Sequence, residues 1–282
     1  MPTSFKLGTR LLWAILLNLF LITEYSRADL IMAYSFDNST VSGNTIVDVS
    51  GTYTGTFTAN VAPGQAGLFG QSFYFDGTNN ASEVKIPYTT APKFGNNFTF
   101  AVRMKYAAAD ANRASYLLHR GTLSDDQNSI IFGFSGPGEM EIFGPQRTGA
   151  DPRPVSKISS IPADTWNHVA YTYDGATLRS YLNGVQTSSS AIVFDLTATG
   201  DMYLGSSGNG FNATSNNFRG FLDDVGFWNE ALSASEILAL SNAPLSVVPE
   251  PGSIAMLTAI CLSSVSFRRL KRRNKGIPHS DI

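Results

Sequence analysis

The amino-acid sequence predicts an all-β fold, a sandwich or jelly roll of antiparallel sheets. Residues 165–185, TWNHVAYTYDGATLRSYLNGV, contain two runs of apolar, β-branched or aromatic residues, each followed by a turn dipeptide, Asp174-Gly175 or Asn183-Gly184. Such dipeptides tolerate the positive φ angles of tight hairpin turns, so this stretch predicts a meander of two or three strands. Similar runs recur along the body between turn residues, and no long segment has the 3.6-residue period of a helix.

The body of the chain carries thirteen candidate strands and one short helix. No Pro/Ser-rich linker divides them, so we expect a single sandwich over residues 29–245. The helix is expected at 233–240, because Ser233 can cap it and Glu236 stands at the capping-box position. The expected strands are 31–36, 57–59, 72–75, 83–86, 97–105, 114–120, 129–134, 139–143, 166–173, 178–182, 191–194, 202–205 and 220–228.

Composition limits the classes of protein that this chain can belong to. Of its 282 residues, 43% are apolar and 12% aromatic, which is ample for a packed core. Residues 29–245 hold eleven basic and nineteen acidic side chains, a net charge of −8. An acidic body argues against nucleic acid as a partner, because phosphate-backbone binding requires a basic face. The single cysteine, Cys261, lies outside the body, so the expected sandwich has no disulfide.

Residues 1–28 have the three parts of a secretory signal peptide. Lys6 and Arg10 precede the apolar run 11–22, and Ala28 stands at the expected cleavage site. The alternatives are a membrane anchor or a buried helix, but about twelve apolar residues are too few to span ~30 Å of hydrocarbon. We therefore expect export by the secretion machinery and a mature chain that begins at residue 29.

Four separated pieces of the body resemble laminin-G-like domains with the concanavalin-A-like jelly roll. They are AYSFD (33–37), SFYFDG (72–77), WNHVAYTYDG with YLNGV (166–185), and RGFLDDVGFWNEALSASEI (219–237), and they occur in the family's order. The resemblance implies a two-sheet antiparallel jelly-roll sandwich in which the first and last strands are adjacent. It also implies that a calcium ion is frequently bound.

The character of the chain changes after residue 245. Pro249, Glu250 and Pro251 are followed by a mostly apolar segment, 252–267, and then by the basic cluster RRLKRR. Proline ends regular strand pairing, a short hydrophobic helix is expected next, and the basic cluster is expected to stay cytoplasmic. The alternative is a stop-transfer anchor, although sixteen residues is short for a span of about 20.

This C-terminal layout resembles the PEP-CTERM sorting signal, in which an exosortase recognises the Pro-Glu-Pro motif. The resemblance covers residues 246–275 and leaves 276–282 as a tail. It implies transient insertion of the C-terminal segment into the inner membrane, processing by the exosortase, and a final place at the cell surface or outside the cell.

A structural calcium site is the first candidate for chemistry. By the two-residue period of a strand, Asp223 is expected to share a face with Val225 and Phe227 at the edge of the core. A buried carboxylate needs a cation, an arginine or backbone donors nearby. The resemblance adds three oxygen ligands of the kind that suits Ca²⁺: Asp37, Asp76 and Asn79. The alternative is that Asp37 and Asp76 are ordinary turn residues.

Carbohydrate binding is the second candidate. The loop 205–217 is rich in Gly, Asn and Ser and contains Phe211, a composition suited to a sugar site on a sandwich. Ordinary turns have the same small polar residues, so the loop can equally be structural.

Catalysis is the third candidate. Glu139 and Glu141 fall on one face of a strand, as do the acidic residues of laminarinase-like glycanases. The third carboxylate of that pattern is missing, because Phe143 and Gly144 occupy the following positions. The histidines have no triad or metal-ligand spacing, and His168 is expected to be structural.

These observations favour an exported, non-catalytic surface or matrix protein that binds polysaccharide or a surface partner. The alternatives are a glycan-cleaving enzyme on the same fold and a purely structural matrix protein.

Overall fold

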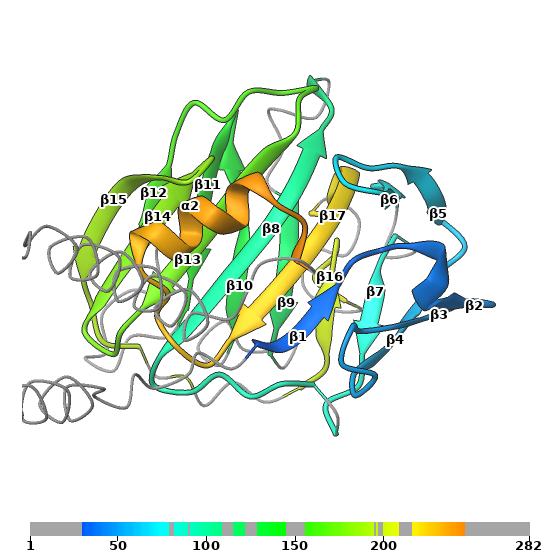
Figure 1. Cartoon of the computed structure of the whole chain (residues 1–282), viewed down its shortest axis with the longest axis horizontal. Helices are drawn as coiled ribbons and strands as arrows, with labels where there is room; N and C mark the ends of the chain where they lie inside the picture. The colour runs from blue at the N-terminus through cyan, green and yellow to red at the C-terminus, as the bar shows by residue number, and fades with distance from the viewer. Residues whose placement is uncertain are drawn as a thin grey trace, which may run out of the picture. The chain divides into compact units, whose positions relative to one another are not determined.

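In the part of the chain that the structure describes, the protein is an antiparallel β-sandwich with one short α-helix on its outside (Figure 1). A computed structural model describes residues 30–78, 82–89, 91–108, 115–121, 129–144, 156–194, 196, 200–208 and 216–245. They belong to one compact unit, Asp29–Val248. The expected all-β, two-sheet fold is thus confirmed.

Sheet A has eight strands, and its central strands are long. The first strand, β1, pairs with the last, β17, so the expected adjacency of the first and last strands is confirmed. The path through the sheet is β15 (Val185–Ala191), β14 (Thr177–Leu182), β13 (Asn167–Tyr173), β8 (Phe98–Tyr106), β17 (Arg219–Trp228), β6 (Gln71–Asp76) and β5 (Val61–Ala66), with β1 (Leu30–Tyr34) off this path.

Sheet B has nine strands, several of them only two or three residues long. A short 3₁₀-helix, η1 (Asn38–Thr40), connects β1 of sheet A to the edge of sheet B. The order in sheet B is β12 (Lys157–Ile158), β11 (Glu139–Phe143), β10 (Ile130–Gly136), β9 (Ser115–Arg120), β16 (Met202–Leu204), β7 (Val84–Ile86), β4 (Thr54–Phe57), β3 (Thr45–Val47) and β2 (Val41–Ser42).

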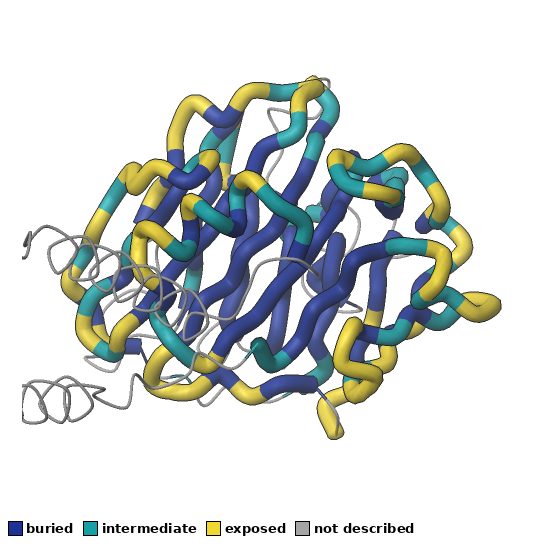
Figure 2. The backbone as a smooth tube through the Cα atoms, in the orientation of Figure 1, coloured by how far each residue is buried: buried dark blue, intermediate teal, exposed yellow. Residues whose placement is uncertain are grey.

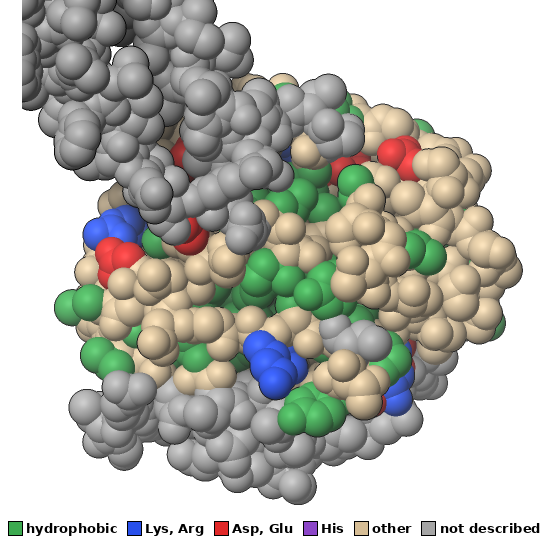
Figure 3. Space-filling model, turned by 60° about the horizontal axis from the view of Figure 1, so that its bottom comes forward, with side chains coloured by type: hydrophobic (Ala, Val, Ile, Leu, Met, Phe, Trp, Pro, Cys, Tyr) green, Lys and Arg blue, Asp and Glu red, His purple; other side chains and the backbone are tan. Residues whose placement is uncertain are grey.

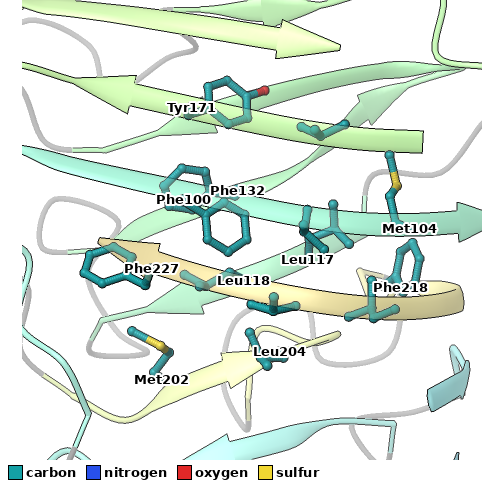
Figure 4. Close-up of a cluster of buried hydrophobic side chains, with 14 of the residues drawn as sticks. Phe100, Met104, Leu117, Leu118, Phe132, Tyr171, Met202, Leu204, Phe218 and Phe227 are labelled. Atoms are coloured by element: carbon teal, nitrogen blue, oxygen red, sulfur yellow. The ribbon is translucent and has the colours of Figure 1, made fainter. Parts of the chain in front are cut away.

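The core lies between the two sheets. Phe100 of β8 and Phe132 of β10 meet across it with ring centroids 4.5 Å apart, and Tyr171 of β13 lies 5.5 Å from Phe132 (Figure 4). In Figure 2 the central strands of both layers are buried, whereas edge strands such as β15 and the turns are largely exposed. The described body therefore has the continuous apolar core that its composition predicted.

The outer face of sheet A is partly covered by α2 (Ala234–Asn242), which lies in front of β13 and β14 in Figure 1. Ser233 caps this helix and forms a capping box with Glu236, as the sequence predicted. The cover explains why β8 is buried on both sides. Phe98, Phe100 and Val102 face the core, whereas Thr99 and Arg103 face outwards and are also buried.

A β-bulge in β17 corrects the expected orientation of Asp223. The register with β8 shifts between Asp223 and Gly226, and Asp224 has a φ of 47°. Leu222, Val225 and Phe227 belong to the core, so Asp223 does not share their face. Because a bulge inserts an extra residue, a strict period of two fails across it, and Asp223 pairs with the outward-facing Arg103 instead.

The predicted position of one strand of the meander was wrong. Residues 191–194 were expected to form a strand, but the third strand is β15, which begins directly after the Asn183-Gly184 turn. Its sequence, VQTSSSA, is polar and largely exposed, so apolar alternation did not reveal it. Main-chain pairing with β14 forms this edge strand, and the outward polar side chains are suited to an edge.

The surface carries few charges, in agreement with a content of 15% charged residues. On the face shown in Figure 3, charged side chains are sparse and hydrophobic ones lie among polar groups. No helix in the described part of the chain is long and apolar enough to cross a membrane. The expected signal peptide and C-terminal segment, including Ala28, Pro249, Glu250 and Pro251, lie outside the described residues.

Candidate functional site

Asp37 and Asp223 reach the same turn, the segment from Gly67 to Gln71 between β5 and β6. Asp223 Oδ2 accepts hydrogen bonds from the backbone N–H groups of Leu68 at 2.9 Å and Phe69 at 3.2 Å. Asp37 Oδ1 accepts one from Gln71 N at 3.0 Å. The two carboxylates thus hold this turn against sheet A, and the structure brings together two of the four predicted calcium ligands.

The neighbouring Asp224 is compensated by a buried arginine. Arg103 Nη1 donates to Asp224 Oδ2 at 2.6 Å, and Arg103 Nη2 donates to the carbonyl oxygens of Leu240 and Ala243 at the end of α2. The expectation that a buried carboxylate requires backbone donors or an arginine is confirmed here, because backbone N–H groups serve Asp223 and Arg103 serves Asp224. Through its hydrogen bonds to Leu240 and Ala243, Arg103 also connects α2 to sheet A.

Burial raises the pKa of both aspartates. The pKa of Asp223 rises to about 7, first because it is desolvated and second because Asp224 lies beside it. The pKa of Asp224 rises to about 6, where burial outweighs the opposing charge of Arg103. Asp223 Oδ1 is buried and has no hydrogen-bond partner.

The other two predicted calcium ligands do not join this group. Asp76 is aligned with Arg219, four residues before Asp223 on β17, a separation of roughly 13 Å along the strand. Its Oδ1 accepts hydrogen bonds from Thr78, so it acts as a turn residue. Asn79 lies outside the described residues. Among those described, no three His, Cys, Asp or Glu side chains lie close enough together to hold a metal ion.

The strands next to the predicted carbohydrate loop carry aromatic and charged side chains on the outer face of sheet B. His119 of β9 pairs in register with Tyr203 of β16, which pairs with Lys85 of β7. The His119 ring lies 6.3 Å from the rings of Tyr203 and Tyr116, nearly parallel to the first. Burial lowers the pKa of His119 to about 4, so this side chain is neutral at physiological pH.

Short polar groups surround these rings. Lys85 Nζ pairs with Asp201 Oδ2 at 2.7 Å, and Asn216 Nδ2 donates to Tyr116 Oη at 3.2 Å. At Gly208 an added Cβ would lie 2.6 Å from the Tyr203 ring, so the glycine allows the loop to pack directly on that ring. Both described ends of the loop 205–217 therefore meet this face. Phe211 lies outside the described residues.

The acidic pair on β11 has the predicted orientation. Glu139 and Glu141 point to the outer face of sheet B, while Met140 between them lies in the core. Lys157 of β12 pairs with Glu139, and its Nζ lies 3.7 Å from Glu141 Oε1. The strand ends at Phe143. A lysine of the neighbouring strand thus contacts both carboxylates, and Phe143 and Gly144 stand where the resemblance to laminarinase-like enzymes would require a third.

His168 lies in β13, and burial together with the charge of Arg103 lowers its pKa to about 3. Its Nδ1 has no hydrogen-bond partner, so the buried ring leaves one nitrogen without a hydrogen bond. Arg103, which pairs with His168 across β8 and β13, was not among the site residues predicted from the sequence. The available signal was a lone arginine inside the apolar strand FTFAVRMKY, which must be covered and compensated when that strand is central.

Comparison with protein families identifies the fold family. Residues 76–238, more than half of the chain, match the model of the concanavalin A-like lectin/glucanases superfamily, Laminin_G_3. The chain belongs to this superfamily. Of the four short pieces of sequence that resemble this superfamily, three overlap the matched residues. A search of curated protein sequences found no match.

Solved structures share the superfamily fold at low sequence identity. One of them is domain 4 of AbnA, a GH43 extracellular arabinanase from Geobacillus stearothermophilus, in complex with arabinotriose. Its sequence is 21% identical and its TM-score is 0.51, and the alignment covers 77% of this chain and 100% of that domain. The receptor-binding domain of botulinum neurotoxin type G is 14% identical with a TM-score of 0.55, and 76% of this chain covers 51% of it. Trypanosoma rangeli sialidase is 18% identical with a TM-score of 0.56, and 75% of this chain covers 32% of it.

Proposed function

We propose that this chain is an exported, non-catalytic protein that binds carbohydrate on the outer face of sheet B. The observation that carries the proposal is the group of aromatic and short polar side chains at the base of the loop 205–217. Tyr116 and Asn216 are partly exposed there and are joined by a hydrogen bond, and Asp201, directly before β16, forms an ion pair with Lys85 of β7 beside them. Rings provide an apolar surface for sugar, and the polar groups can bind its hydroxyls.

The comparisons support a carbohydrate ligand through the fold alone. The similar domain of the arabinanase was solved with arabinotriose, and the similar sialidase with a difluorosialic acid. These ligands belong to those proteins, and the identities are too low to transfer them. They support the choice of glycans as the first ligands to test.

Binding to a panel of neutral polysaccharides by affinity electrophoresis tests this proposal. Tyr116→Ala and Asn216→Ala should each weaken binding by about tenfold, which corresponds to 1.4 kcal/mol. Val185→Ala, an exposed position on β15 of the other sheet, is the matched control and should bind as the parent does. If Tyr116→Ala and Asn216→Ala both bind as the parent does, the carbohydrate site does not lie on this face of sheet B.

A glycan-cleaving activity is the second candidate, and it rests on Glu139 and Glu141 sharing one face of β11. We favour the non-catalytic function, because Lys157 contacts both carboxylates and Phe143 replaces a third. A reducing-sugar assay on the same polysaccharides should detect no turnover. Turnover that is abolished by Glu141→Gln would establish the enzyme instead.

Structural calcium is a proposal that rests on Asp37 and Asp223. The unpartnered Asp223 Oδ1 is a suitable hard ligand, and because Ca²⁺ takes six to eight oxygens, main-chain carbonyl groups and water would supply those that the described acidic side chains do not. Chelation should lower the melting temperature of the parent and have no effect on Asp223→Asn. An unchanged melting temperature after chelation would remove calcium from the proposal.

The destination of the protein is part of the same proposal. We infer export, transient inner-membrane insertion, exosortase processing and delivery to the cell surface or matrix, with extracellular polysaccharide as the partner. The support is the sequence of residues 1–28 and 246–275. A purely structural matrix protein remains the alternative, which uniformly negative glycan binding would favour.

A further inference from the structure

A row of aromatic and basic side chains crosses the outer face of sheet A. It consists of Tyr74 on β6, Phe221 on β17, Lys105 on β8 and Trp166 directly before β13, and we call it the aromatic row. Phe221 pairs in register with both Tyr74 and Lys105, and Asn167, the residue after Trp166, pairs with Met104. Four adjacent strands spaced about 4.8 Å apart thus carry one straight row of about 15 Å.

The side chains of the row contact one another above the sheet. The Phe221 ring lies 4.9 Å from that of Tyr74 and 6.3 Å from that of Trp166. Lys105 Nζ lies 4.4 Å from the Phe221 ring centroid and 5.4 Å from that of Trp166. The ammonium group is therefore held between two ring faces, in a cation–π arrangement that fixes its position.

The aromatic row is open to solvent, although the neighbouring part of the same face is not. Tyr74, Lys105, Trp166 and Phe221 are all partly exposed, whereas Arg103, two residues before Lys105 on the same face of β8, is buried against α2. A large aromatic side chain rarely stays at a surface without a reason when three such rings are contiguous. The exposed row therefore indicates an interaction surface.

The charge of the row is positive and incompletely neutralised. Lys105 forms no ion pair with any residue in the described part of the chain, although the body has an excess of acidic side chains. Arg219, exposed on the same face of β17, extends the row, and its Nε donates a hydrogen bond to Tyr74 Oη at 3.4 Å.

We propose that the aromatic row binds a second glycan, an extended polysaccharide whose sugars carry carboxylates. The apolar faces of its sugar rings would stack on Trp166, Phe221 and Tyr74, and its carboxylates would pair with Lys105 and Arg219. A linear row across the strands suits a linear chain, and two cations among aromatic rings suit an anionic sugar.

Isothermal titration of the full chain with polygalacturonate tests this site. The parent should bind, added salt should weaken the binding, and Lys105→Met should lower the affinity by about tenfold while keeping most of the aliphatic packing. Trp166→Ala should have a similar effect. Lys93→Met, which removes an exposed lysine outside the row, is the matched control and should bind like the parent.

The outcomes separate this site from the proposed site on sheet B. Loss of polygalacturonate binding in Lys105→Met, with neutral glycan binding and melting temperature retained, supports the aromatic row alone. A parent that binds neutral glycans but not polygalacturonate overturns the second site and leaves the first intact. Equal binding by Lys105→Met, Trp166→Ala and the parent overturns it as well. So does binding to anionic lipid vesicles, in place of polygalacturonate, that depends on the same residues.

Discussion

At the scale of single residues, His119 is a buried base whose charged form is suppressed. Desolvation lowers its pKa to about 4, below the 6.5 of an unfolded histidine. The stability that follows is present in full above pH 6.5, shrinks as the pH falls, and is lost once the pH passes the folded pKa near 4. The raised pKa of Asp223 has the opposite effect on stability, because that carboxyl group favours the folded state as the pH falls. A comparison of variants is therefore needed to isolate the contribution of His119.

We predict that His119→Phe makes the protein less sensitive to acid. The phenyl ring keeps the contacts with Tyr116 and Tyr203 but cannot be protonated. Between pH 6.5 and 4 the parent should lose about 3 kcal/mol of unfolding free energy relative to the variant, because each pKa unit is worth 1.36 kcal/mol. Urea unfolding across this pH range measures the difference. Parallel pH profiles for the two proteins would show that His119 is not held neutral.

Arg103 is the residue on which the outer face of sheet A depends. We predict that Arg103→Met costs roughly 3–5 kcal/mol of unfolding free energy, because it leaves Asp224 buried without a counter-charge and frees the end of α2. Adding Asp224→Asn should recover part of the loss, since the uncompensated carboxylate is then removed. Urea denaturation of both variants measures this. A single variant that loses less than about 1 kcal/mol would contradict the assigned role.

At the scale of elements, the turn between β14 and β15 shows how a local pattern is joined to tertiary packing. Asn183 and Gly184 have φ angles of 50° and 81°, as the hairpin dipeptide predicted. An added Cβ at Gly184 would lie 2.7 Å from Leu238 Cδ1 and from Ser241 Oγ of α2. This glycine therefore serves both the turn and the packing of the helix.

We predict that Gly184→Ala destabilises the protein more than Gly175→Ala does. Both glycines have positive φ angles, so each substitution should cost about 1–2 kcal/mol of backbone strain. At Gly175 the nearest atom to an added Cβ is 3.3 Å away, so the contact with α2 adds a cost only at Gly184. Unfolding free energies of the two variants provide the measurement, and equal losses would rule out the helix contact.

The strands that the sequence predicted well are those with strong apolar alternation, such as β8, β13 and β17. Those that it missed or misplaced are polar or very short, including β2, β3, β5, β12 and β15. Their formation depends on main-chain pairing with a neighbour that is distant in the sequence or joined by a tight turn. The bulge at Asp223 belongs to the same class, because only the register with β8 reveals it.

At the scale of the whole molecule, we propose that the terminal segments, residues 1–28 and 246–275, direct the export and sorting of the protein. We predict that replacing Pro249, Glu250 and Pro251 by alanine leaves unprocessed protein in the inner membrane, because the exosortase would no longer recognise its motif. Immunoblots of fractionated cells that express the parent and the variant measure this. The body fold should be unchanged in both, and normal release of the variant would refute the sorting prediction.

The class of fold, the cap of α2 and the hairpin turns could be predicted without the structure, because each depends on patterns of residues close together in the chain. The sequence also indicated the face of Glu139 and Glu141, since the irregular pairing beside them adds a residue to β10 and not to β11. Only the tertiary structure decided the partners of Asp223, the ion pair of Arg103 with Asp224, and the alignment of Trp166 with Tyr74 across four strands. These depend on register between segments far apart in the sequence, where one extra residue turns a side chain from one face of a sheet to the other.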